Sequence, residues 1–297
     1  MLCCLSMSPT ADANQLTETP APGSTPDLGL VHPRPTFAEH WTIPEGPVAE
    51  ADWHYCQVKD LRSVLDHWLA RTRRNAKAYC NLAIKVRQDM PQVGFDPDVY
   101  LVEPPPPDPK LRSLRLWKPG HVVPSLVIEI VSPRHLHKDY RDIPLQCAAV
   151  GVKELVVFDP LLAGPKAGEG PQLMHLWREQ SDGTFLRVAY GRRPVYSTVL
   201  GAFFVVVGEG PELRIADDHL GQQLWPTAEE AAMAACRVAT AAYQREHFQM
   251  KAALEEKKVA LEEKKAALEE KKAALEKNDA LVARVTQLEA ELNKRDP

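Results

Sequence analysis

The chain has 297 residues, of which 44% are hydrophobic and 26% are charged, which is typical of a soluble globular protein with one or two domains. Its 36 Lys and Arg residues against 40 Asp and Glu residues give a net charge of −4. This balance excludes a protein coated in positive charge, but not a local basic strip that contacts nucleic acid. No apolar run approaches the roughly eighteen residues that a membrane-spanning helix needs, so we expect no membrane partner.

Cysteine content and N-terminal composition give two further expectations. Six cysteines, none of them in a C-x-x-C pair, do not form the pattern of a disulfide framework, so we expect reduced thiols and a cytoplasmic protein. Residues 1–35 are rich in Pro, Thr, Ser, Ala and Asp and have no hydrophobic period. Such a segment buries too little surface to offset the entropy of ordering, and we expect a disordered tail.

The first periodic segment, residues 59–72, predicts a helix with one apolar face. That face consists of Leu61, Val64, Leu65, Trp68 and Leu69. Four cations follow closely, at Arg71, Arg73, Arg74 and Lys77. They either complement the negative C-terminal end of the helix or form a patch that contacts phosphates.

The middle of the chain alternates strand-like and helix-like segments. Residues 78–86 and 99–102 are predicted strands, and residues 126–131 form an apolar strand interrupted by a single carboxylate. Residues 139–150 predict a helix that ends at a glycine C-cap, and residues 155–158 predict another buried strand. The order strand, helix, strand indicates a crossover unit in a buried sheet.

The C-terminal third combines short strands with a long helix. Residues 172–190 predict a hairpin, and residues 202–207 and 212–216 predict two more strands. Thr227 and Glu230 have the spacing of a capping box, which predicts the start of a helix.

A seven-residue repeat follows in this helix. Its leucines, which share one heptad position, are Leu254, Leu261, Leu268 and Leu275. With these leucines at position d, position a holds lysine, so half of the apolar seam of a coiled coil is missing. The repeat therefore indicates either a weak coiled-coil stem, hence a homo-oligomer, or a solvated single helix.

Two carboxylates stand out because of their surroundings. Glu129 lies inside the apolar strand 126–131, and Asp98 immediately precedes the strand 99–102. Because an unpaired buried carboxylate is costly, Glu129 should be paired, protonated or bound to a metal. If both strands share a sheet, Asp98 and Glu129 can point to the same face and bind Mg²⁺. Alternatively, Asp98 caps a turn and Glu129 pairs with an arginine.

The motifs around these carboxylates resemble a known family. They are the run 124–133 (PSLVIEIVSP), His137-Lys138-Asp139-Tyr140, and the run 151–160 (GVKELVVFDP). Together they resemble the putative restriction endonuclease domain family (Uma-two type) of the PD-(D/E)XK nuclease superfamily, over roughly residues 37–230. Pro97-Asp98 matches the family's early Pro-Asp, and Glu129 matches its strand glutamate. The resemblance implies a magnesium-dependent DNA endonuclease in which Asp98 and Glu129 bind the metal.

The chain also departs from the pattern of this superfamily. The superfamily's lysine ordinarily follows the glutamate by two residues, and here that position is Val131. The stretch 142–147, where the family carries a substitute lysine, has none, and Cys147 stands where a tyrosine is usual. Lys138 is the nearest cation that could reach the site. These departures leave open a catalytically degenerate module that binds or oligomerises through its C-terminal helix.

The sequence thus predicts a mixed α/β fold with three parts. Residues 1–35 are the tail, residues 36–225 a restriction-endonuclease-like domain, and residues 226–297 a long helix. The expected function is magnesium-dependent hydrolysis of DNA phosphodiester bonds, with Asp98, Glu129 and Lys138 as catalytic residues.

Overall fold

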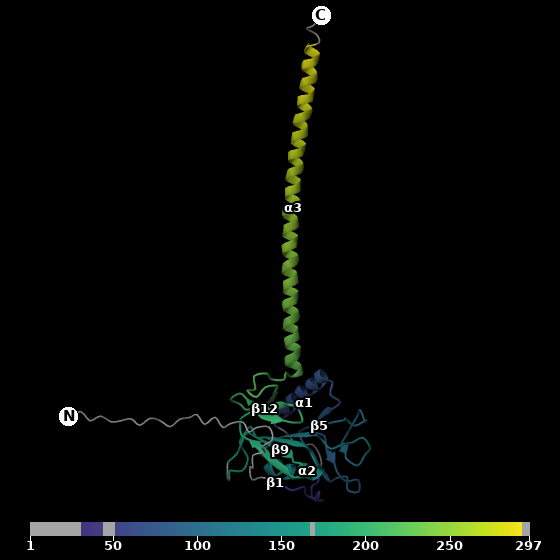
Figure 1. Ribbon diagram of the computed structural model, residues 1–297, viewed down its shortest axis with the longest axis vertical. Coiled ribbons are helices and arrows are strands. Elements are labelled where there is room, and N and C mark those ends of the chain that lie inside the picture. Colours follow the sequence, from purple (N-terminus) through teal and green to yellow (C-terminus); the bar gives the residue numbers. More distant parts are fainter. Residues whose placement is uncertain (1–30, 44–50, 167–169, 293–297) are drawn as a thin grey trace, which may run out of the picture. The chain divides into compact units, whose positions relative to one another are not determined.

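The computed structural model describes residues 31–43, 51–166 and 170–292 (Figure 1). The chain divides into two compact units, Met1–Glu229 and Glu230–Pro297. Residues 1–30 of the predicted tail lie outside the described residues. The predicted boundaries of the three parts of the chain stay predictions.

Strands dominate the first unit. Its elements in chain order are β1 (Val31–His32), α1 (Asp52–Thr72), β2 (Lys77–Cys80), β3 (Ile84–Lys85), β4 (Gly94–Phe95), β5 (Val99–Val102), β6 (Leu114–Arg115), β7 (Leu126–Ile130), the π-helical turn η1 (Lys138–Asp142), α2 (Ile143–Val150), β8 (Glu154–Phe158), β9 (Met174–Glu179), β10 (Phe185–Tyr190), β11 (Val195–Ser197), β12 (Ala202–Val207) and β13 (Glu212–Ala216). The helix α3 (Ala228–Leu292) begins directly after Thr227, where the capping-box spacing predicted a helix start.

A seven-stranded mixed sheet organises this unit, in the order β1-β10-β9-β8-β7-β5-β2. β7 and β8 are parallel and are joined through α2, which is the predicted crossover unit. The other neighbours in this sheet pair antiparallel. The fold is therefore the predicted mixed α/β class. Two small sheets accompany it, β11-β12-β13 and β4-β3-β6.

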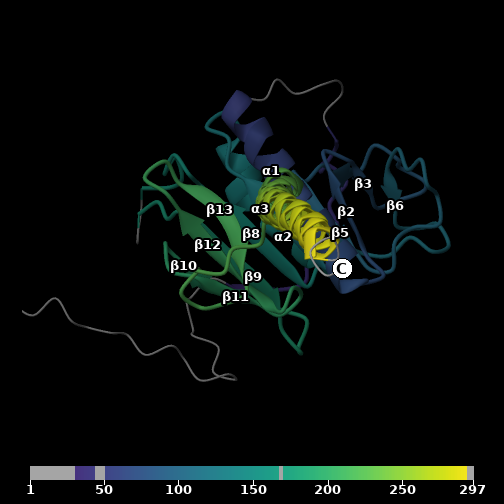
Figure 2. The ribbon, with the colours of Figure 1, turned by 90° about the horizontal axis from the view of Figure 1, so that it is seen from above.

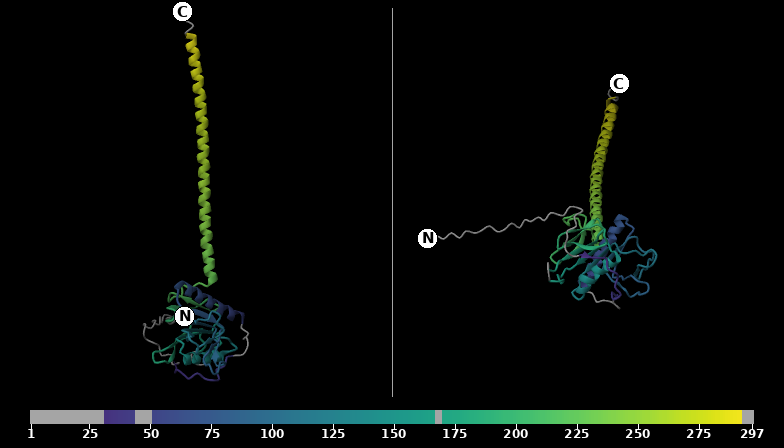
Figure 3. Two further views of the ribbon diagram at one scale, coloured as in Figure 1. Left: turned by 90° about the vertical axis from the view of Figure 1, so that its right-hand side faces the viewer. Right: turned by 60° about the horizontal axis from the view of Figure 1, so that its bottom comes forward.

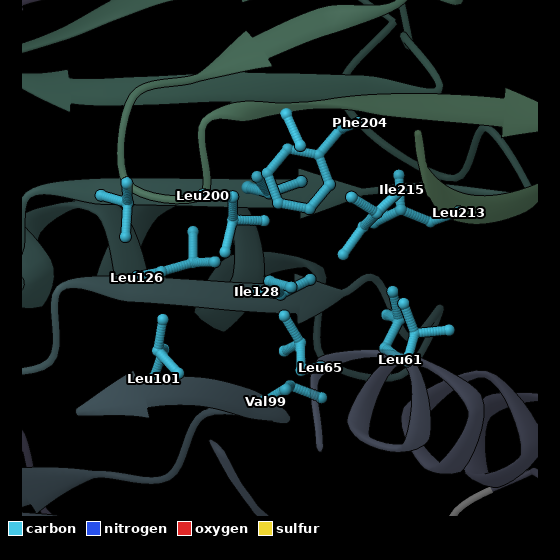
Figure 4. Packing of buried hydrophobic residues seen from close by; sticks show 14 of the residues in the cluster. Leu61, Leu65, Val99, Leu101, Leu126, Ile128, Leu200, Phe204, Leu213 and Ile215 are labelled. Carbon is cyan, nitrogen blue, oxygen red and sulfur yellow. The ribbon is translucent and has the colours of Figure 1, made fainter. Parts of the chain in front are cut away.

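One face of the large sheet packs against α1 and against the sheet β11-β12-β13. Figure 4 shows Leu65 of α1 beside Val99 of β5 and Ile128 of β7, with Leu61 farther along α1 and Phe204 approaching from β12. All five side chains are almost fully buried. Burial of this apolar surface is the main source of stability for the unit.

The opposite face packs against α2 and the sheet β4-β3-β6. Because side chains alternate along a strand, Tyr100 and Val102 of β5 and Val127 of β7 point to this second face. Ile84 and Leu114 of the small sheet join the same cluster. In Figure 2, β3 and β6 lie on the side of the molecule where β2 and β5 are found.

Several predicted elements differ in detail from the structure. The single strand predicted at 78–86 is two strands in different sheets, because the chain turns at Asn81, whose φ is +47°. The helix predicted at 139–150 is divided into η1 and α2, with Pro144 in the first turn of α2. Gly151, at φ +85°, ends α2 as predicted.

The predicted tail also contains a short strand. Val31 and His32 form β1 and pair with β10, although both fall within residues 1–35. The ring of His32 stacks on Trp177 with centroids 4.8 Å apart. The edge of the sheet and this aromatic contact therefore order two residues whose composition alone predicts disorder.

The helix α3 is continuous in both views of Figure 3. Its heptad leucines, Leu254 to Leu275, are 54–61% exposed. The heptad lysines instead pair with glutamates three residues before them, as in Lys258 and Glu255 at 3.2 Å. Within the described parts of the chain, the search for a helix both long and apolar enough to span a bilayer found none.

We predict that Leu65→Ala lowers the free energy of unfolding of the first unit by about 2–5 kcal/mol, because it leaves a cavity in the core. Leu220, 62% exposed, is the matched control, and Leu220→Ala should cost less than about 0.5 kcal/mol. Urea denaturation followed by tryptophan fluorescence measures both variants, since all six tryptophans lie before residue 226. Equal losses in the two variants would contradict this description of the core.

Candidate functional site

Two neighbouring strands place Asp98 and Glu129 on the same face of the large sheet. Asp98 comes directly before β5 and shares the alternation of Tyr100, while Glu129 lies in β7 and shares that of Val127. β5 and β7 are adjacent and antiparallel. Asp98 is 7% exposed and Glu129 is 1% exposed. Two carboxylates are thus buried next to each other on the second face of the large sheet.

Backbone groups and a histidine hold the carboxylate of Asp98. The N–H of Ile130 donates to Asp98 Oδ2 at 2.7 Å, and the N–H of Asp98 donates to Glu129 Oε2 at 3.3 Å. His54 Nε2 lies 3.2 Å from Asp98 Oδ2 and 3.1 Å from the carbonyl oxygen of Ile130. Since both oxygens are acceptors, Nε2 is the protonated nitrogen in this arrangement. The first turn of α1 thereby reaches the start of β5 and the end of β7.

Lys138 provides the cation beside Glu129. Its Nζ lies 2.6 Å from Glu129 Oε1 and 4.0 Å from Asp139 Oδ1. The partner of Glu129 is therefore a lysine rather than the arginine of the alternative interpretation. Lys138 is the first residue of η1, a turn that the sequence predicted only as part of a regular helix.

Two hydrogen bonds anchor η1 above the sheet. The N–H of Ser132, just after β7, donates to Asp139 Oδ2 at 2.9 Å. The hydroxyl of Tyr140 donates to Asp159 Oδ2 at 2.6 Å, at the end of β8. Because Asp139 and Tyr140 follow Lys138 directly, these bonds fix the backbone from which the lysine reaches Glu129.

The electrostatics follow from burial. Burial raises the pKa of Glu129 well above its ordinary value, Asp98 raises it further, and the ammonium of Lys138 opposes both effects. Burial by itself would lower the pKa of Lys138, but the nearby carboxylates, Glu129 foremost, raise it overall, so the lysine stays charged. Burial also raises the pKa of Asp139, to about 6.

These side chains line one cavity of about 950 Å³. Asp98, Glu129, Lys138, Asp139 and His54 all contribute to its wall. The remaining wall includes aromatic side chains, an exposed cation and a buried amide, which are Trp41, Trp53, Phe95, Arg134 and Gln146. A volume of this size is large enough for a nucleotide-sized group beside the carboxylates.

The residues fit a hard divalent cation held in part by water. In the described ranges, no three His, Cys, Asp or Glu side chains form a cluster able to hold a metal ion. Mg²⁺ does not need such a cluster, because it keeps several water ligands and binds through one or two carboxylates. Asp98 and Glu129, both in the cavity wall, are the two carboxylates that would hold such an ion.

Sequence reasoning missed the role of His54. His54 lies 44 residues before Asp98 in the chain, and no motif in the sequence links the two. The four cations after residue 70 have mostly structural contacts. Arg73 is the left-handed C-cap of α1, and Arg74 donates to Glu103 Oε1 at 2.9 Å.

We predict that His54→Ala lowers the free energy of unfolding by about 1–3 kcal/mol, since it removes a buried donor from two acceptors. His54→Gln, which retains a side-chain N–H, should recover part of this loss. Urea denaturation followed by circular dichroism measures both variants. Identical losses would indicate that packing, and not the donated proton, is what His54 contributes.

Comparisons with known proteins place the chain in a family. None of the functionally curated proteins matches it. A solved structure described as a putative nuclease belonging to DUF820 from Anabaena variabilis ATCC 29413 is similar, with 17% identity, a TM-score of 0.37, and coverage of 52% of this chain and 76% of that chain. The sequence model of the Uma2 family, described as "Putative restriction endonuclease", matches residues 42–230, which is more than half of the 297 residues. The chain therefore belongs to the Uma2 family of restriction-endonuclease-like proteins.

Proposed function

We propose that the protein is a magnesium-dependent endonuclease that hydrolyses DNA phosphodiester bonds. Asp98 and Glu129 are the metal ligands in this proposal, and Lys138 is the third catalytic residue. Family membership supports a nuclease in general terms. The finer assignment of metal, substrate and residues rests on the geometry of the cavity.

The observation that carries the proposal is the contact of Lys138 Nζ with Glu129 Oε1 at 2.6 Å. At the position where the superfamily usually has its lysine, this chain has Val131. That side chain is fully buried in the hydrophobic cluster on the second face of the large sheet. Lys138 supplies a cation to the same carboxylate from η1 instead of from the strand. An ammonium has three donors, so one can hold Glu129 while the others contact water or phosphate.

The chemistry of each group follows from its charge and position. Bound Mg²⁺ would polarise the phosphate and lower the pKa of the attacking water. Lys138 would orient that water and stabilise the negative charge that develops on the phosphate oxygens. His54 and the N–H of Ile130 hold Asp98 in place, and Arg134 at the cavity wall offers an exposed cation for a neighbouring phosphate.

Lys138→Ala should reduce plasmid nicking in Mg²⁺ by roughly 100-fold or more, because the transition state loses a preorganised cation. Asp98→Asn and Glu129→Gln should reduce nicking at least as much, and chelation of Mg²⁺ should abolish it. The control is Lys153→Ala, which removes an exposed lysine from the loop before β8 and should leave the rate within about twofold. Circular dichroism confirms that each variant is folded. Nicking that persists unchanged in the Asp98 and Glu129 variants would refute the proposal.

A second candidate is a binding and assembly module in which the nuclease fold is inactive. The exposed leucine row of α3 favours self-association as a property of the chain, whether or not the site is active. With Leu261 at d, position e holds glutamate and position g holds lysine, as in Glu262 and Lys257. In a parallel pair, g of one helix faces e of the next heptad of its partner, so a second copy meets opposite charges. An antiparallel pair would face like charges.

We therefore expect full-length protein to sediment as a homo-oligomer at micromolar concentration. The double variant Leu261→Glu, Leu268→Glu should sediment as a monomer, because it places like charges in the seam. Its matched control, Ala260→Glu with Ala267→Glu, adds the same charges outside the seam and should remain associated. A monomeric wild-type chain would eliminate the oligomer.

A cytoplasmic location stays a prediction from the cysteine content.

A further inference from the structure

The segment between β5 and β7 has a charge opposite to that of the whole chain. The connection, residues 103–125, contains four Lys or Arg residues against Glu103 and Asp108, whereas the net charge of the chain is −4; its part 109–125 has no Asp or Glu. We call these four residues, Lys110, Arg112, Arg115 and Lys118, the basic strip. Such a local excess of one sign creates a positive potential over a limited part of the surface.

The cations of the basic strip are available to a partner. Lys110, Arg112 and Lys118 are exposed, and within the described residues none of the three forms an ion pair with a carboxylate. Arg115 is half-buried and donates from Nε to Ser113 Oγ at 3.2 Å. Exposed cations without an ion pair leave a local positive potential that an external anion can neutralise.

The backbone of the strip is held in place. The N–H of Leu116 donates to the carbonyl of Lys85 in β3 at 3.0 Å, and that of Lys118 donates to the carbonyl of Arg115 at 2.9 Å. The N–H of Arg115 donates to His121 Nδ1 at 3.1 Å. These bonds fix the spacing of the cations, so less entropy is lost when they engage a partner.

The strip lies close to the candidate site. β6, which contains Arg115, pairs with β3, and β3 pairs with β4. Gly94 and Phe95 of β4 line the cavity that holds the two carboxylates. Since neighbouring strands are spaced by about 4.8 Å, β6 is about 10 Å from β4 at the cavity wall, which corresponds to about three phosphates along one strand of duplex DNA.

We propose that the basic strip binds the phosphate backbone of duplex DNA on one side of the bond that is cleaved. This inference rests on the proposed nuclease function, because it takes DNA as the partner of the adjoining cavity. Contacts from lysine and arginine to phosphates position a protein on DNA without reading its sequence. The strip would therefore contribute affinity and register, and would leave the chemistry to Asp98, Glu129 and Lys138.

The test is binding of a fluorescein-labelled DNA duplex to full-length protein, measured by anisotropy in EDTA over a series of salt concentrations. The strip variant Lys110→Ala, Arg112→Ala, Lys118→Ala should weaken binding at least about tenfold at low salt and reduce the salt slope by roughly 2–3. The control removes three exposed lysines elsewhere in the first unit, as Lys59→Ala, Lys153→Ala, Lys166→Ala, and should bind within about twofold of wild type. A charge-preserving variant, Lys110→Arg, Arg112→Lys, Lys118→Arg, should restore the slope.

The outcomes separate this inference from the proposed function. Binding is measured without divalent metal, so a strip-dependent slope supports the inference even if plasmid nicking fails. Unchanged affinity and slope in the folded strip variant overturn it, as does a wild-type chain that binds no duplex at low salt. Equal strip-dependent binding of poly-glutamate overturns the assignment of DNA and indicates an acidic protein partner instead.

Discussion

The site depends on the burial of two adjacent carboxylates within one hydrophobic face. A lone ionised carboxylate in such a place would be strongly disfavoured, and a second one beside it makes ionisation harder still. The chain compensates with donors from three directions, which are the N–H of Ile130, the imidazole of His54 and the ammonium of Lys138. Removing any one partner from such an arrangement leaves charge uncompensated, so α1, η1 and the sheet have to fold around the same point.

The need for a cation beside Glu129 of β7 is met by Lys138, although this lysine belongs to the turn η1 and not to the strand. A lysine at position 131 would lie on the same face as Glu129, but Val131 there is fully buried in the cluster beneath α2. The loop after β7 instead folds back, because Asp139 accepts the N–H of Ser132. That bond places Lys138 over Glu129, and the bond of Tyr140 to Asp159 holds the turn from the other side. The motifs around residues 137–140 and 159–160 thus act together on one cation.

Local patterns in the sequence predict much of this fold, and for a clear physical reason. Alternation and apolar runs gave β5, β7 and β8, and the same alternation predicted that Asp98 and Glu129 share a face. The contacts that could not be predicted from the sequence join residues that are far apart in the chain. His54 is brought to Asp98 only by the packing of α1, and the short strands β4 and β6 form because β3 pairs with both. The π-helical turn likewise depends on anchors outside its own five residues.

The charged side chains have different surroundings in α3, in the candidate site and in the basic strip. In α3, lysines and glutamates occur in equal numbers in each Glu-Glu-Lys-Lys repeat, and Lys258, Lys265 and Lys272 pair with glutamates three residues before them, so the opposite charges largely offset one another along the helix. In the candidate site, the charges are few but buried, where low dielectric makes each one strong. The basic strip is the third case, since three of its four cations are exposed and, within the described residues, form no ion pair with a carboxylate. A slightly acidic protein can therefore still attract a polyanion to one place, because the attraction depends on the local field and not on the net charge.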